Sequence, residues 1–197
     1  MMNEFEEEYW EQLHTLIWTG FYNLDQLSEV LQDMIEDHSY QELEEPADQP
    51  MLQQKVEREF QRKIEEEKSW PETTDCDRLN TAFEEMNQIG IIAIQNAGYT
   101  ISDGIEDVSQ EVEERNSKQI LGYCFYHQQD LEHAIEDREL HLAFGDLSDN
   151  PEQMVSVGIR VKQILEKHRF DVEWDEDPEK RISILDFDWK KRTIMSS

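Results

Sequence analysis

The apolar positions of the first 70 residues follow the spacing of helices. Asn23, with Gln26 three residues later, forms the N-cap pattern of a helix. The apolar residues that follow recur at helical spacing: Leu24, Leu27, Leu31, Met34 and Ile35. A second, narrower stripe steps by four through a heavily charged stretch that Trp70-Pro71 ends: Leu52, Val56, Phe60 and Ile64. Because an isolated helix of this length is marginal in water, we expect this stripe to dock on the chain's own α/β domain or on a second copy of the chain.

From residue 72 the pattern alternates between helices and strands. Thr74 or Asp75 caps a helix that Gly90 ends, Asp103 with Glu106 begins another, and Asn150-Pro151 begins a third. Short apolar or alternating runs predict the strands: 91–94, 120–126, 140–144, 170–174 and 181–185. The order α-β-α-β-α-β-α-β-β predicts a sheet with helices packed on it, mostly parallel in its middle and ending in a hairpin.

These patterns together predict the α+β class. We expect an acidic helical N-terminal segment over residues 1–71 and an α/β domain over residues 72–197. In that second domain, helices should cover a small mixed sheet.

The charge of the chain narrows the set of partners. It has 47 acidic and 18 basic residues, a formal net charge of −29. Residues 160–192 are neutral, so residues 1–159 carry the whole excess. Such a chain is repelled by nucleic acid and by phosphate-rich membrane surfaces, so we expect neither as a direct partner. The acidic surface either keeps the protein solvated, or it meets a basic partner protein or mimics nucleic acid. The expected partner is thus a protein, which could be basic, or a second copy of the chain.

The two cysteines and the N-terminal residues indicate the cellular compartment in which the protein is expected. The sequence begins MMNEFEEEYW, which is acidic where a secretory signal would be basic and then apolar. Cys76 and Cys124 lie far apart, and reduced thiols in the cytoplasm are the expected state. We therefore expect a cytoplasmic protein. The chain has no CxxC motif or Cys/His cluster, so no metal site is expected.

The run Gly122-Tyr-Cys-Phe-Tyr-His-Gln-Gln-Asp130 is the leading candidate for chemistry. It begins as a strand that is apolar on both faces, which is typical of the interior of a sheet. Ligands of open α/β sheets bind beyond the carboxyl ends of such strands. If neighbouring strands are parallel, other connections reach the same edge, and a candidate pocket follows: Tyr99, Ser102, Asp103, His127, Gln129, Asp130 and Asp146. There, His127 would lie between the phenol of Tyr99 and the carboxylate of Asp146, which would raise its pKa.

Two structural alternatives stand beside this interpretation. In the first, Gln129 or Asp130 caps the next helix while His127 packs on Tyr99 or Trp174. In the second, Asp103 satisfies the start of its own helix, which would otherwise suit an anion.

Several short segments resemble a known family. They are Glu67-Lys-Ser-Trp-Pro-Glu72, Thr74-Asp-Cys-Asp-Arg-Leu79, Asn96-Ala-Gly-Tyr-Thr100 with Ser102-Asp-Gly104, Gly122–Asp130, Leu142-Ala-Phe-Gly145 and Val172-Glu-Trp-Asp175. Together they resemble a family of acidic bacterial proteins described as a domain of unknown function. The resemblance implies no activity, ligand or catalytic residue. It places six candidate residues within family motifs: Tyr99, Ser102, Asp103, His127, Gln129 and Asp130.

Two classes of function remain open from the sequence. No P-loop, G-x-G-x-x-G or G-x-S-x-G motif is present, so no cofactor is expected and no catalytic residue is assigned. The first expectation is a non-catalytic binding or regulatory protein with a strongly acidic surface. The alternative is a small hydrolase or transferase with a pocket around His127, in which the polar groups would converge.

The charge distribution makes a direct prediction about nucleic acid. We expect no micromolar binding to a random DNA or RNA duplex at physiological salt, because residues 1–159 carry the whole excess of negative charge. Fluorescence anisotropy across a salt series measures this. Binding that weakens steeply as salt is added would contradict the prediction.

Overall fold

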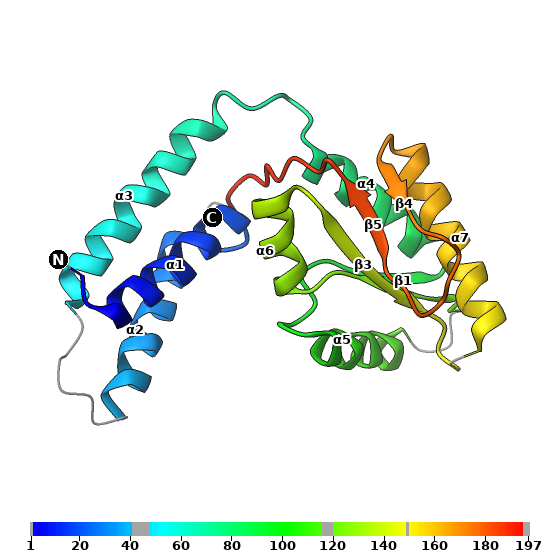
Figure 1. Cartoon of the computed structure of the whole chain (residues 1–197), viewed down its shortest axis with the longest axis horizontal. Helices are drawn as coiled ribbons and strands as arrows, with labels where there is room; N and C mark the ends of the chain where they lie inside the picture. Colours follow the sequence, from blue (N-terminus) through cyan, green and yellow to red (C-terminus); the bar gives the residue numbers. More distant parts are fainter. Residues whose placement is uncertain (1, 41–47, 116–119, 149, 195–197) are drawn as a thin grey trace. The chain divides into compact units, whose positions relative to one another are not determined.

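The chain forms two compact units. The computed structural model describes residues 2–40, 48–115, 120–148 and 150–194. Unit 1 comprises Met1–Glu72 and the C-terminal residues from Lys190, and unit 2 comprises Thr73–Trp189. Figure 1 shows the helices and strands of each unit. Unit 1 contains α1 (Glu4–Thr19), α2 (Leu24–Tyr40) and α3 (Gln49–Glu67). Unit 2 contains the remaining elements: α4 (Asp75–Gln88), β1 (Ile91–Ile94), α5 (Ile101–Glu114), β2 (Gly122–Phe125), α6 (Gln128–Asp137), β3 (Leu140–Gly145), α7 (Pro151–Lys167), β4 (Asp171–Glu173) and β5 (Ile182–Leu185).

The helices of unit 1 pack around one apolar core. Leu52 and Val56 of α3 are fully buried, and they share a cluster with Leu13 of α1 and with Leu27 and Leu31 of α2. The narrow stripe of α3 therefore packs on α1 and α2. The expected partner, the α/β domain or a second copy, was wrong for this stripe, because two further amphipathic helices lie within the same unit and supply the apolar surface.

A buried lysine joins the C-terminal residues to unit 1. Lys63 of α3 is fully buried, and its Nζ donates to Glu67, to the carbonyl of Lys191 at 3.0 Å and to Oγ1 of Thr193 at 2.7 Å. Glu67 in turn accepts from the backbone N–H of Thr193 at 2.9 Å. The domain expected over 72–197 included these last residues, whereas they bond to α3. A buried ammonium requires a carboxylate and further acceptors, and the C-terminal segment supplies two of them.

Unit 2 contains a mixed sheet with the strand order β1-β2-β3-β5-β4. β1 and β2 are parallel, whereas β2–β3, β3–β5 and β5–β4 are antiparallel. The mixed sheet and the closing antiparallel pair are confirmed. The expectation of a mostly parallel middle is wrong.

The connection through α6 explains the reversed strand. Only Arg138 and Glu139 separate α6 from β3, and Arg138 has left-handed backbone angles with φ 59°. β3 begins directly at the far end of this helix and runs back, pairing Tyr123 with Gly145 and Phe125 with Ala143. Alternation of helix and strand in a sequence does not specify the direction in which a helix leaves a strand.

Helices cover both faces of the sheet. α4 and α7 contact each other and cover one face, while α5 and α6 lie on the other face (Figure 1). The closest approach is at Gly104 of α5, where an added Cβ would lie 2.3 Å from the ring of Phe125. Glycine therefore lets α5 lie directly on β2.

The outer edge of β1 is closed at its middle by a side chain. The amide of Asn87 donates to the carbonyl of Ala93 at 3.0 Å and accepts from the N–H of Ala93 at 3.1 Å. Arg115 also donates to Oδ1 of Asn87 at 2.8 Å and holds the amide in place. The side chain thus makes the pair of bonds that a neighbouring strand would make there.

The buried lysine makes a prediction about stability. Lys63→Met should lower the free energy of unfolding by about 3 kcal/mol, because removing one partner leaves a buried charge without its match. Lys68→Met is the matched control, since Lys68 forms an exposed pair with Glu65, and it should change stability by less than about 0.5 kcal/mol. Urea denaturation measures both. Equal effects of the two variants would show that the buried cluster does not stabilise unit 1.

Candidate functional site

The parallel strands β1 and β2 end side by side, and their connections are bonded to each other. The N–H of Ala97 donates to the carbonyl of Tyr126 at 2.9 Å, and the N–H of Gln128 donates to the carbonyl of Gly98 at 3.1 Å. These bonds bring the starts of α5 and α6 to the same edge of the sheet. Tyr99 and His127 therefore follow strands that end at the same edge.

The start of α5 is occupied by its own side chains. Thr100 is the N-cap, and Oδ2 of Asp103 accepts from the N–H groups of Thr100 at 2.8 Å and Tyr99 at 3.1 Å. These bonds, led by the one from the backbone of Thr100, hold the pKa of Asp103 below its ordinary value of 3.8. The helix end that could have held an anion is satisfied by a carboxylate of the chain.

The start of α6 has the same design with an unusual cap. His127 is the N-cap, and its backbone N–H donates to Oδ2 of Asp130 at 3.0 Å. The side chain of His127 is 4% exposed and that of Asp130 is 1% exposed. The expectation that Gln129 or Asp130 is the cap was therefore wrong by two or three positions, although Asp130, at the third helical position, accepts from the backbone N–H of the N-cap residue.

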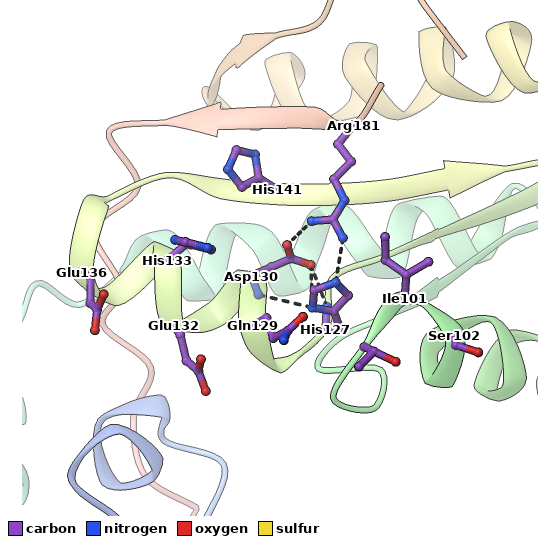
Figure 2. Close-up of a pocket in the computed structure, with 11 residues that line it drawn as sticks. Ile101, Ser102, His127, Gln129, Asp130, Glu132, His133, Glu136, His141 and Arg181 are labelled. Atoms are coloured by element: carbon purple, nitrogen blue, oxygen red, sulfur yellow. Dashed lines mark hydrogen bonds and ion pairs between the residues drawn. The ribbon is translucent and has the colours of Figure 1, made fainter. Parts of the chain in front are cut away.

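Arg181, directly before β5, completes a buried cluster with these two residues (Figure 2). Its Nη1 donates to Oδ1 of Asp130, and its Nη2 lies 2.7 Å from Nε2 of His127. A guanidinium can only donate, so Nε2 must accept. The proton of the neutral ring is then on Nδ1, which lies 3.2 Å from Oδ2 of Asp130. In this tautomer the 3.4 Å contact between the N–H of Asp130 and Nδ1 is not a hydrogen bond.

The cluster sets the protonation of His127. Burial lowers the pKa of His127 below its ordinary value of 6.5, and the positive charge of Arg181 also lowers it. The carboxylates of Asp130 and Asp103 raise this pKa, but they do not outweigh the two lowering effects. The expected upward shift was wrong, because the prediction paired the ring with Tyr99 and Asp146 and did not include a cation. A neutral imidazole is the form that accepts from Arg181.

Asp146 lies at the other end of its strand. Because β3 is antiparallel to β2, the carboxyl end of β3 is at the opposite edge of the sheet from His127. Burial raises the pKa of Asp146, but hydrogen bonds from Ser148 and from the N–H of Asn150 outweigh burial and hold it below 3.8. Asp146 shapes the turn before α7 and is not part of this site.

A cavity of about 670 Å³ opens beside the cluster. Its lining comes from the start of α5, from α6, from β3 and from Arg181: Thr100, Ile101, Ser102, His127, Gln129, Asp130, Glu132, His133, Glu136, His141 and Arg181 (Figure 2). Four of the candidate residues are in this lining: Ser102, His127, Gln129 and Asp130. Tyr99 and Asp103 come from the same connection but do not line the cavity, and the side chain of Tyr99 is exposed.

Sequence reasoning missed the groups that give the cavity its charge. Glu132 and Glu136 are one turn apart on α6, so the helical spacing after Asp130 could have identified them. Arg181 lies 51 positions from Asp130, and no local pattern links the two residues.

Two further features restrict the chemistry of the described residues. No group of three or more His, Cys, Asp or Glu residues in these segments is arranged to hold a metal ion. No helix in the same segments is long and apolar enough to cross a bilayer.

The comparisons with known proteins identify the family. A family model described as Domain of unknown function (DUF6891) matches residues 2–193. The chain belongs to this family. The match to DUF6891 covers both units and all seven candidate residues. None of the curated proteins and none of the solved structures matches the chain.

The lowered pKa of His127 predicts a pH dependence of stability. In the unfolded protein the imidazole of His127 takes up a proton near pH 6.5, whereas in the folded protein it does so only at a lower pH. The unfolded state therefore binds more protons in the window below 6.5, and stability falls as the pH decreases through that window. His127→Asn keeps a capping side chain that does not titrate. Its stability should vary less than that of the wild type between pH 7.5 and 5.5, measured by urea denaturation, and equal slopes would contradict the shift.

Proposed function

We propose that this protein is a non-catalytic binding or regulatory protein whose acidic surface engages a positively charged protein. The observation that carries the proposal is the engagement of His127, because Arg181 occupies Nε2 while Asp130 faces Nδ1. A general base needs a free nitrogen within reach of the proton that it removes. This ring has none to offer without breaking the cluster.

The other polar groups at this edge also argue against catalysis. Asp103 is used in a helix cap, and Asp130 is paired with Arg181. Within the described residues, no hydrogen bond joins the hydroxyl of Ser102 to a histidine or a carboxylate. A serine nucleophile requires an adjacent base. The hydrolase or transferase alternative therefore has less support than binding.

The charge supports a basic partner. An excess of acidic groups raises the encounter rate with positively charged proteins and suppresses encounters with nucleic acid. A cytoplasmic location is part of the proposal, and its support is that both cysteines, Cys76 and Cys124, are buried. Burial also raises the pKa of Cys124, which keeps its thiol protonated and unreactive.

Two measurements test the proposal. First, wild type and His127→Asn should hydrolyse activated carboxylic and phosphate esters no faster than buffer. Turnover by the wild type that the variant loses would favour the enzyme alternative.

Second, proteins captured from a native lysate by the full chain should be basic, and added salt should release them because the attraction is electrostatic. Capture of mainly acidic proteins, unaffected by salt, would overturn the proposal.

A further inference from the structure

The apolar face of α5 extends beyond the part that the sheet covers. Gly104 and Val108 are buried against β2 and its neighbours. Ile101 lies three residues before Gly104 and Ile105 three residues before Val108, on the same side of the helix, but they are 48% and 37% exposed. The apolar face of an amphipathic helix is normally packed against the rest of the protein. The N-terminal part of α5 instead leaves part of its apolar face, at Ile101 and Ile105, exposed to solvent. Ile101 and Ile105 are called the α5 shelf below.

One residue of the α5 shelf, Ile101, lines the same cavity as two carboxylates of α6. Ile101 lines the cavity with Glu132 and Glu136, whose side chains project in the same direction from α6 (Figure 2). Among the described residues that line the cavity, Arg181 is the one lysine or arginine, and the buried carboxylate of Asp130 matches its charge. Glu132 accepts one long bond, 3.4 Å from Gln128, and Glu136 has no cation partner among the described residues. The cavity therefore carries uncompensated negative charge.

The acidic side chains at the C-terminal end of α6 are unfavourable for the helix dipole. Its last turn holds Glu136 and Asp137 and no basic residue, although the C-terminal end of a helix is negative and favours cations. Arg138 could offset them, but its guanidinium binds Asp186 instead, with Nε 3.0 Å from Oδ1. A positive group from outside the chain would relieve this repulsion.

We propose that the α5 shelf and the α6 carboxylates together form the docking site for an amphipathic basic segment of a partner protein. A lysine or arginine of that segment enters the cavity toward Glu132 and Glu136, and an apolar side chain of the same segment covers Ile101 and Ile105. Charge complementarity selects the basic residue, and the exposed isoleucines select a peptide over a small organic cation. This assignment rests on the proposed function and names where that function takes place.

Four variants of the full chain test the site. Glu132→Gln/Glu136→Gln removes the cavity charge, and Glu113→Gln/Glu114→Gln removes the same charge from the exposed end of α5. Ile101→Ser/Ile105→Ser removes the α5 shelf. Its control, Ile89→Ser/Leu147→Ser, removes two apolar side chains of the same size that are exposed outside the site. Thermal melting checks that each variant folds.

The probe is a labelled lysine–leucine peptide that forms an amphipathic helix, followed by fluorescence anisotropy. Two matched peptides replace lysine by glutamine or leucine by serine, and a linear polyamine serves as a competitor. We expect both site variants to weaken binding of the lysine–leucine peptide about tenfold, which corresponds to about 1.4 kcal/mol. Both control variants should change it less than about threefold, and each replaced peptide should bind weakly.

The outcomes separate this inference from the proposed function. Equal weakening by the control variants would mean that the acidic surface attracts cations without a site, so the site assignment fails while the proposed function stands. Full competition by the polyamine with no effect of the isoleucine variant would identify a small-cation site and overturn the peptide assignment. No binding of any cationic probe by the wild type would overturn both.

Discussion

Asp130 is a carboxylate with almost no access to water, and unit 2 is arranged around matching its charge. An ionised group that is buried without a partner costs several kcal/mol or more. The match comes from Arg181 at the start of β5 and from the backbone and ring of His127 at the end of β2. One charge thus ties α6 to two strands. The bond from the backbone of the N-cap residue and the long-range pair with Arg181 thus meet at the same carboxylate.

The same constraint appears in unit 1 with the sign reversed. There the buried ion is the ammonium of Lys63, and Glu67 and Thr193 supply its partners. Burial raises the pKa of Glu67, but the bonds from Lys63 and Thr193 outweigh it and leave the pKa below 4.5. Each unit therefore uses a buried ion to hold a segment that is distant in the sequence. Three other carboxylates are buried, those of Glu6, Glu59 and Asp146, and most of the remaining acidic residues that the structure describes are in contact with solvent.

Local patterns were sufficient for most of the fold and for part of the candidate site. The order of helices and strands after residue 79, the interior position of β2 and the caps at Asn23, Thr74 and Asn150 follow from spacing and side-chain chemistry. The direction of β3 could not be predicted from such patterns, because the length of α6 does not determine the direction in which this helix leaves the end of β2. That error moved Asp146 to the wrong edge. Arg181 was read only as the start of a strand, since pairing across 51 positions leaves no periodic signal.

The Asn87 side chain that closes β1 has a consequence for how this protein meets copies of itself. An open strand edge is a template on which another chain can add its own strand, and this is the common route to fibrils. At Ala93 both backbone groups are already taken by the amide, and Arg115 fixes that amide from behind. Chain-to-chain growth along this edge would first have to displace two side chains. The β1 edge of the sheet is therefore protected by geometry at Ala93 as well as by the charge repulsion between acidic chains.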